Sequence, residues 1–161
     1  MTGLNLRAAV VLALAAAPLA AQDYTFRPAL QPEVRAEVAV ARRASAVGMA
    51  GLNIPLGLYV RAGINAGMGV ADTRAGAALA LRADAAVRFL LDPFAQHIWG
   101  PYAGGGLTAR RDGAERVRAG LLVILGVEGR RTGRWTPAVE VALGEGARLE
   151  IVLRKARQNG R

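Results

Sequence analysis

The chain has 161 residues, no cysteine and a formal net charge of +9 that is carried by 20 Arg and a single Lys. This length is enough for one domain with a core, and the absence of cysteine excludes disulfides, lipoprotein attachment and thiolate metal sites. The Arg residues are spread along the chain, often two positions from Asp or Glu, which argues against a nucleic-acid-binding patch.

Residues 1–21 have the three parts of a signal peptide. "MTGLNLR" is a short basic segment, "AAVVLALAAAPL" is apolar, and Ala20-Ala21 before Gln22 form a cleavage site. About twelve apolar residues are too few to cross a bilayer of roughly 30 Å. The sequence therefore predicts an exported protein.

The mature chain is expected to form a single β-barrel domain over residues 33–157. Residues 22–32, "QDYTFRPALQP", precede it as an N-terminal lead-in without alternation, and residues 158–161 follow as a C-terminal tail. Within the domain apolar and polar residues alternate; in "AALALRADAAVRFLLD", Leu79 and Val87 lie on one side while Arg82 and Asp84 lie on the other. A period of two residues is typical of a strand with one apolar and one polar face.

Short turns divide this domain into consecutive strands. Pro and Gly interrupt the alternation repeatedly, and Asp112-Gly113 is a strong hairpin signal. Seven strands are expected, or eight if residues 46–53 form one of their own. A long antiparallel meander avoids open edges by closing on itself, so we expect an all-β, up-and-down barrel of about eight strands.

The glycine-rich stretch "AGGGL", residues 103–107, belongs to one of these strands in our interpretation. A phosphate-binding loop would need a Lys and a following helix, which this segment lacks. Glycine in a strand instead marks a bend or a close approach of another group.

Two features favour an apolar face that points outward to lipid. The segments 57–70, 75–91 and 116–128 exceed the roughly 9 to 11 residues of a membrane strand. The opposite face pairs Arg with carboxylates, which suits a crowded interior. The predicted lumen charge network is Glu37, Arg61, Arg82, Asp84, Arg88, Arg118, Glu140, Glu150 and Arg154, and the same polar face also carries Glu33, Arg35, Arg110, Arg116, Glu128 and Arg148.

Aromatic residues lie near the expected strand ends. Membrane barrels carry aromatic girdles at this level, where the lipid headgroups begin. The girdle candidates are Phe94, Trp99, Tyr102 and Trp135.

With its signal peptide, its hairpin meander and segments such as "YVRAGINAGMGV", "ERVRAGLLVILGVEG" and "ARLEIVLRKAR", the chain resembles the small bacterial outer-membrane β-barrel proteins of OmpA/OmpX-like architecture. The resemblance implies an outer-membrane location with periplasmic termini, and an Arg-carboxylate network in the lumen. It also implies membrane lipid and the barrel-assembly machinery as partners. One departure is the end of the chain, "LRKARQNGR", where many of these barrels close on an aromatic residue.

No catalytic, cofactor or metal site is predicted. His97 and Ser45 are the only residues of their types, and neither stands in a catalytic motif. One His, no Cys and no carboxylate cluster at ligand spacing argue against metal binding. We therefore expect no enzyme activity and no cofactor. A barrel enzyme acting on lipids would need His97 close to Ser45, or a carboxylate at the rim.

The expected function is a structural or envelope and surface-interaction role in the outer membrane. The first alternative is a soluble periplasmic, lipocalin-like barrel whose apolar face points inward and binds a small hydrophobic ligand. The second alternative is a narrow minor pore with anion preference. An eight-stranded barrel is just wide enough for side chains to fill, which favours a closed lumen.

Overall fold

The computed structural model describes residues 30–40, 43–94 and 98–155. The predicted signal peptide, most of the lead-in, His97 and the predicted tail lie outside the described residues. The strands are β1 (Gln31–Val40), β2 (Ala44–Pro55), β3 (Val60–Thr73), β4 (Gly76–Leu90), β5 (Gly100–Asp112), β6 (Arg118–Glu128), β7 (Trp135–Leu143) and β8 (Ala147–Lys155).

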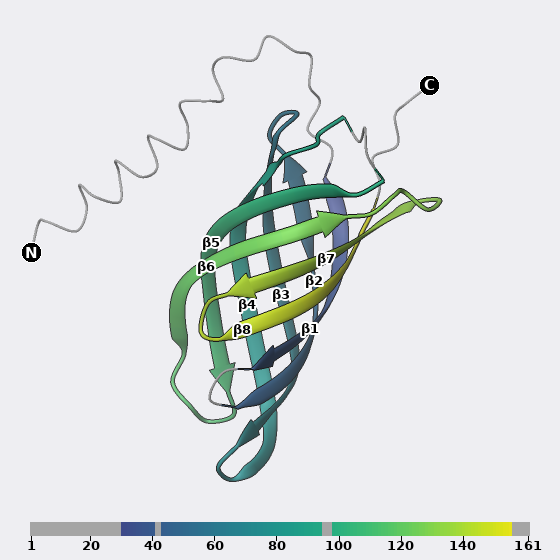
Figure 1. Ribbon diagram of the computed structural model, residues 1–161. Coiled ribbons are helices and arrows are strands. Elements are labelled where there is room, and N and C mark those ends of the chain that lie inside the picture. The colour runs from purple at the N-terminus through teal and green to yellow at the C-terminus, as the bar shows by residue number, and fades with distance from the viewer. Residues whose placement is uncertain (1–29, 41–42, 95–97, 156–161) are drawn as a thin grey trace, which may run out of the picture.

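These strands form one closed antiparallel barrel (Figure 1). Each strand pairs with the next in the chain, and β8 pairs back with β1; Glu37, for example, lies between Val47 of β2 and Glu150 of β8. The predicted up-and-down barrel is confirmed. The open choice between seven and eight strands is settled by β2, a full strand of 12 residues.

One boundary differs from the sequence-based expectation. β1 begins at Gln31, so the last two residues of the expected lead-in are already paired with β2.

The glycines of two predicted features lie where the sequence placed them. The strand β5 includes the whole "AGGGL" stretch, as expected for strand glycines. At the predicted Asp-Gly turn, Gly113 has a φ of 56°, a left-handed conformation that glycine adopts without steric cost.

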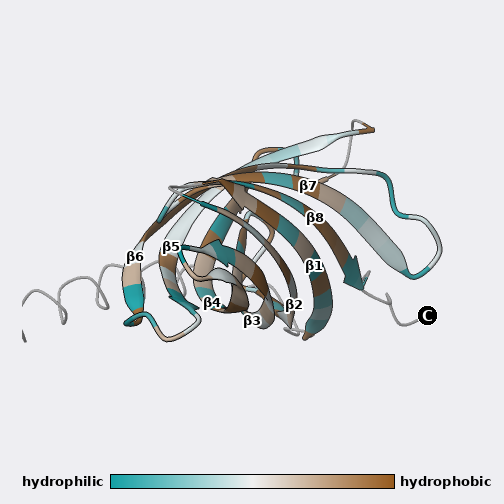
Figure 2. Cartoon of the chain, turned by 90° about the horizontal axis from the view of Figure 1, so that it is seen from below, coloured by the Kyte–Doolittle hydropathy of each residue, from teal (hydrophilic) through white to brown (hydrophobic). Residues whose placement is uncertain are grey.

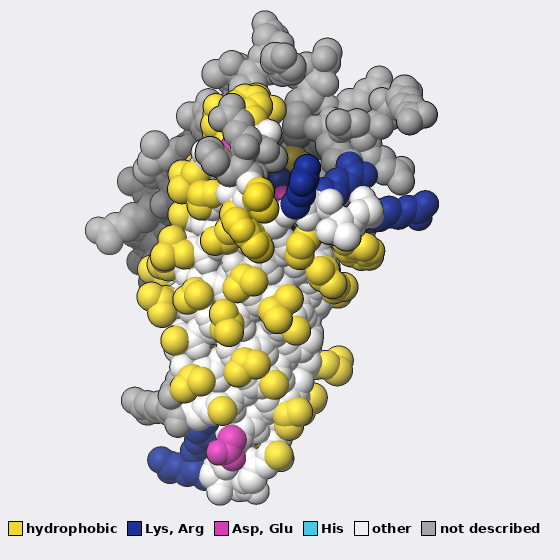
Figure 3. All heavy atoms as spheres, turned by 45° about the vertical axis from the view of Figure 1, so that its right-hand side comes forward, with side chains coloured by type: hydrophobic (Ala, Val, Ile, Leu, Met, Phe, Trp, Pro, Cys, Tyr) yellow, Lys and Arg dark blue, Asp and Glu magenta, His cyan; other side chains and the backbone are white. Residues whose placement is uncertain are grey.

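Alternation along the strands separates a polar interior from an apolar exterior. In β1 every second residue from Gln31 is buried and every residue between is exposed, and β8 repeats the pattern. Figure 2 shows the corresponding alternation of hydrophilic and hydrophobic residues along the strands. The exposed side chains include Val38, Leu79, Leu125 and Ile151, and Figure 3 shows such apolar groups covering the side of the barrel. A lipocalin-like barrel would need the reverse arrangement.

Glycines on the inner face of β3 and β5 lie where the backbone of a neighbouring strand comes very close. Gly67 pairs with Arg82, and Gly104 pairs with Arg88. A Cβ atom on Gly67 would lie 2.1 Å from the carbonyl oxygen of Gly48. Small residues on both neighbouring strands therefore let the wall curve tightly around the charged groups.

The two ends of the barrel differ in their connections. The terminal end, where β1 begins and β8 ends, carries the β2–β3, β4–β5 and β6–β7 connections, residues 56–59, 91–99 and 129–134. The opposite end carries shorter links on average, residues 41–43, 74–75, 113–117 and 144–146. No helix in the described part of the chain is long and apolar enough to cross a membrane.

Candidate functional site: the ion-paired interior

The barrel interior holds equal numbers of positive and negative side chains. All eight strands except β2 contribute at least one charged group to it, and β2 contributes Ser45 and Asn53. The described charged side chains on this inner face are seven Arg residues (Arg35, Arg61, Arg82, Arg88, Arg110, Arg148 and Arg154) and seven carboxylates (Glu33, Glu37, Asp84, Asp112, Glu128, Glu140 and Glu150). Their formal charges cancel, so the described interior contributes nothing to the net charge of the chain.

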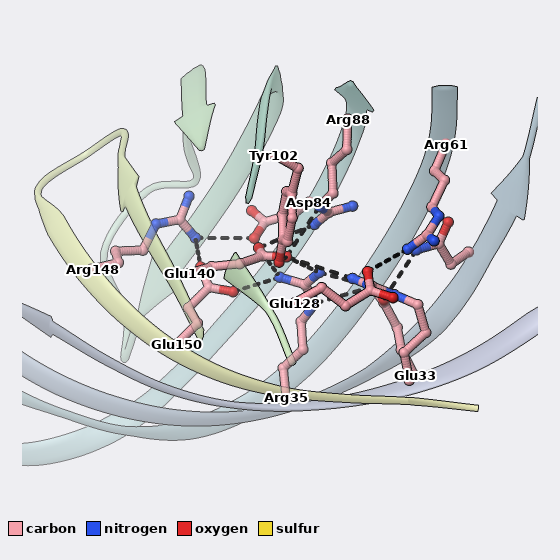
Figure 4. Close-up of polar contacts among 12 residues, drawn as sticks. Glu33, Arg35, Arg61, Asp84, Arg88, Tyr102, Glu128, Glu140, Arg148 and Glu150 are labelled. Atoms are coloured by element: carbon pink, nitrogen blue, oxygen red, sulfur yellow. Dashed lines mark hydrogen bonds and ion pairs between the residues drawn. The ribbon is translucent and has the colours of Figure 1, made fainter. Parts of the chain in front are cut away.

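Glu140 of β7 is the centre of the largest group (Figure 4). One of its oxygens accepts from Arg35 Nη1 at 2.7 Å and the other from Arg88 Nε at 3.1 Å. The hydroxyl of Tyr102 also donates to Glu140, at 2.7 Å. A buried carboxylate with several donors is satisfied without water, which offsets much of its desolvation cost.

A second group joins β8 to β1 and β4. Nη1 of Arg148 lies 3.1 Å from Glu37 and 3.0 Å from Asp84. Arg82 of β4 reaches Glu37 from the other side at 3.1 Å. Because β4 stands opposite β8 in a ring of eight strands, the link between Asp84 and Arg148 runs across the lumen.

A third group lies nearest the terminal end. Glu128 of β6 accepts from Arg61 of β3 at 2.5 Å and from Arg154 of β8 at 2.9 Å. Arg154 also donates to Glu33 of β1 at 3.0 Å. Side chains from distant strands thus meet at three levels along the barrel axis.

Open space remains at the two ends of the barrel. A cavity of about 400 Å³ at the terminal end is lined by Arg61, Leu90 and Glu128 among others. At the opposite end a cavity of about 1190 Å³ is lined by residues that include Arg110 and Glu145. The ion-paired groups lie between these two mouths.

Most of the predicted network residues lie inside the barrel. These are Glu37, Arg61, Arg82, Asp84, Arg88, Glu140, Glu150 and Arg154. Arg118 does not: it is exposed and forms a 2.9 Å ion pair with Glu115. β6 begins at Arg118, so this side chain stands at the mouth and extends into solvent.

Sequence reasoning left several interior residues out of the network. Arg35 and Arg148 have many partners, and strand alternation already placed both on the polar face. Asn53 and Thr108 are fully buried neutral residues, for which alternation of charge gives no signal.

The aromatic candidates divide between the exterior and the interior. Phe94, Trp99 and Trp135 are exposed by 61%, 60% and 42%, all at the terminal end. Tyr102 is only 2% exposed, so the girdle assignment for this residue is wrong. Its position in β5 points its ring inward, where Gly126 of β6 leaves space for it.

Three carboxylates in the interior approach each other at a spacing that can hold a cation. Oxygens of Glu37, Asp84 and Glu150 lie within 4.8 Å of one another, a cluster that sequence spacing did not reveal. Nη1 of Arg148 lies 3.1, 3.0 and 3.9 Å from these carboxylates. The guanidinium group therefore takes the position in which a metal ion would neutralise them.

No family model matches the chain, and no curated protein sequence matches it. Several solved structures, however, are similar to the chain. The chain is similar to Neisserial surface protein A (NspA), with a TM-score of 0.59 and 13% identity over 78% of this chain and 94% of that one. It is also similar to the N-terminal β-barrel domain of Pseudomonas aeruginosa OprF, with a TM-score of 0.53 and 11% identity over 80% and 99% of the two chains.

A designed protein has the same architecture. A structure from the de novo design of transmembrane β-barrels matches with a TM-score of 0.50 and 15% identity, over 78% of this chain and 92% of that one. At these identities the matches establish the fold. The predicted resemblance to small eight-stranded outer-membrane barrels is confirmed at that level.

Proposed function

We propose that this protein is an integral outer-membrane β-barrel with a closed lumen and a structural, non-catalytic role in the envelope. In this proposal residues 1–21 direct export, and the barrel-assembly machinery inserts the mature chain. The single observation that carries the proposal is the inside-out distribution of polarity: buried ion pairs inside and an apolar surface outside.

The exterior fits a lipid environment better than water. A soluble protein rarely exposes a continuous apolar surface, because such a surface promotes association. Here exposed large apolar side chains occur on all eight strands, for example Val38 of β1, Ile64 of β3 and Leu149 of β8. A closed barrel also satisfies the strand hydrogen bonds internally, as the membrane interior requires.

The interior fits a closed barrel better than a pore. An ion entering from either mouth meets the group at Arg61 and Glu128, the group at Glu140 and the group at Asp84 and Arg148. Displacing any of them would expose unpaired buried charges at a cost of several kcal/mol. The equal numbers of Arg and carboxylate groups also remove the net positive field that an anion pore needs.

The first experiment is cell fractionation of the expressed protein, followed by gel migration of the detergent-extracted band with and without boiling. We expect recovery in the outer-membrane fraction and a change of migration on boiling, since a closed barrel remains compact until heated. Recovery as a soluble monomer that does not associate with detergent would overturn the proposal.

A second experiment tests closure. The purified protein in planar bilayers is expected to give no sustained ion conductance. A stable single-channel current in folded wild-type protein would instead support the narrow-pore alternative.

A further inference from the structure

The β6–β7 connection forms a basic projection at the terminal end of the barrel (Figure 1). Its sequence, "GRRTGR", places Arg130, Arg131 and Arg134 in six residues, all three exposed. Lys155 is also exposed and pairs across the strands with Trp135, the residue that follows this segment. We call Arg130, Arg131, Arg134 and Lys155 the basic rim.

Three of the four cations of the basic rim have no acidic partner among the described residues. In residues 30–40, 43–94 and 98–155, the side chains of Arg130, Arg134 and Lys155 form no ion pair with a carboxylate. Nε of Arg131 donates to the carbonyl oxygen of Gly133 at 2.9 Å, which braces the turn. Asp92, an acidic residue at this end, is half-buried, and neither it nor Arg131 is without a partner.

Both tryptophans of the chain stand beside the basic rim. Trp135 begins β7, and the ring of Trp99 lies so close to Gly129 that a Cβ there would be 3.1 Å from its Cζ3. Both rings are exposed. Trp favours the membrane interface, where an amphipathic ring contacts both acyl chains and headgroups.

The opposite end is different in composition. Its exposed cations are accompanied by Asp72, Glu115 and Glu145, and Glu115 pairs with both Arg43 and Arg118. No tryptophan lies there, because both lie at the terminal end. In the view of Figure 3, Arg and Lys side chains lie just beyond the apolar surface at the terminal end, and others lie at the opposite end beside an acidic side chain.

We propose that the basic rim binds the phosphate groups of anionic phospholipids in the leaflet that surrounds the terminal end. The cations lie directly beyond the apolar surface and beside interfacial tryptophans, which is the level of lipid phosphates. Arg and Lys near an anionic membrane surface each contribute an attraction that weakens with salt. This inference rests on the proposed membrane insertion, and it adds a selectivity among lipids.

The experiment uses the two tryptophans as reporters. Folded full-length protein is reconstituted in phosphatidylcholine vesicles that contain either brominated phosphatidylglycerol or brominated phosphatidylcholine at equal mole fraction. Because both tryptophans lie at the basic rim, bromine quenching of their fluorescence measures the lipids that surround it. We expect a relative association constant of roughly 3 in favour of phosphatidylglycerol at low salt, decreasing towards 1 at high salt.

A matched pair of variants locates the effect. The triple variant R130Q/R134Q/K155Q should lose the preference for phosphatidylglycerol, whereas R74Q/R111Q/R116Q at the opposite end removes the same charge and should keep it. Heat-modifiable migration shows that each variant is folded.

The outcomes separate this inference from the proposed function. Equal quenching by both brominated lipids in the folded wild type would overturn the inference and leave the membrane barrel intact. A preference that survives in the rim variant would also overturn it. Absence of quenching by either lipid would mean that the barrel exterior does not face acyl chains, so that the proposed function fails as well.

Discussion

Arg148 of β8 and Asp84 of β4 form an ion pair at 3.0 Å across the interior of the barrel. The two residues are 64 positions apart in the sequence and lie on opposite walls. Their contact shows that the barrel is narrow, because one side chain from each of two facing strands is enough to span the lumen. Removing the bridge therefore changes both the electrostatics and the packing of the lumen.

The link between Asp84 and Arg148 is expected to show strong energetic coupling. In a double-mutant cycle of Asp84→Ala and Arg148→Ala, the coupling free energy of unfolding should exceed about 1.5 kcal/mol, because each single change leaves a buried charge with fewer partners. Urea unfolding in detergent or lipid, followed by heat-modifiable migration, measures it. The exposed pair Glu115 and Arg118 is the control, with a coupling of about 0.5 kcal/mol or less. Equal coupling in both pairs would contradict the description of a buried network.

Tyr102→Phe tests the hydrogen bond to Glu140. The substitution keeps the ring and removes only the hydroxyl that donates at 2.7 Å to the carboxylate. We expect a loss of about 1.5 to 3 kcal/mol in the free energy of unfolding, since the acceptor is charged. Tyr59→Phe is the control because Tyr59 is half exposed. An unchanged stability of the Tyr102 variant would place that hydroxyl in contact with water.

Gly126→Ala tests the close contact between β6 and the Tyr102 ring. A Cβ atom at this position would lie 2.4 Å from Cζ of Tyr102 and 2.6 Å from its hydroxyl oxygen. The ring must move away, so we expect a destabilisation of about 1 to 3 kcal/mol in urea unfolding. Gly48→Ala is the matched control, since nothing lies within 4 Å of its Cβ position. Similar stabilities of the two variants would show that Tyr102 is not packed against β6.

Ile151→Arg tests the lipid-facing surface. Ile151 is 58% exposed near the middle of β8. A charged residue near the bilayer midplane costs about 2 to 4 kcal/mol, so refolding into vesicles should be less complete than for the wild type. Leu58→Arg, in the β2–β3 turn, should refold normally because it lies at the end of the barrel. If Ile151→Arg refolds as well as Leu58→Arg, this face of β8 does not contact acyl chains.

Strand alternation predicted the fold and most of the charged residues of the interior. The period of two residues in β4 placed Arg82, Asp84 and Arg88 on one face, and the structure has all three inside. The same rule failed for Arg118, because alternation does not say where the lumen ends and solvent begins. It also failed for Tyr102, since an aromatic residue near a strand end suits either an interfacial girdle or an interior with a facing glycine. That choice depends on the register with β6, which the sequence of one strand does not specify.

The partners within the interior could not be predicted for the same reason. Arg35 contacts Glu140 and Glu150, which are 105 and 115 positions away. Any Arg on the inner face could pair with several carboxylates until strand tilt and register are known. The sequence therefore predicts which types of residue line the interior, but it does not predict which of them form ion pairs with each other.

The pairing of β1 with β8 also has a consequence for the order of assembly. Glu33, Arg35 and Glu37 of the first strand take partners from β7 and β8, at the other end of the described chain. A partly folded sheet of β1 to β6 thus lacks these partners of the first strand, and contacts of such long sequence separation form slowly. Arrival of the last hairpin completes the hydrogen-bonded ring and at the same time supplies these ionic partners of the first strand. Closure of the sheet and completion of the ion pairs in the lumen are therefore expected to be one event.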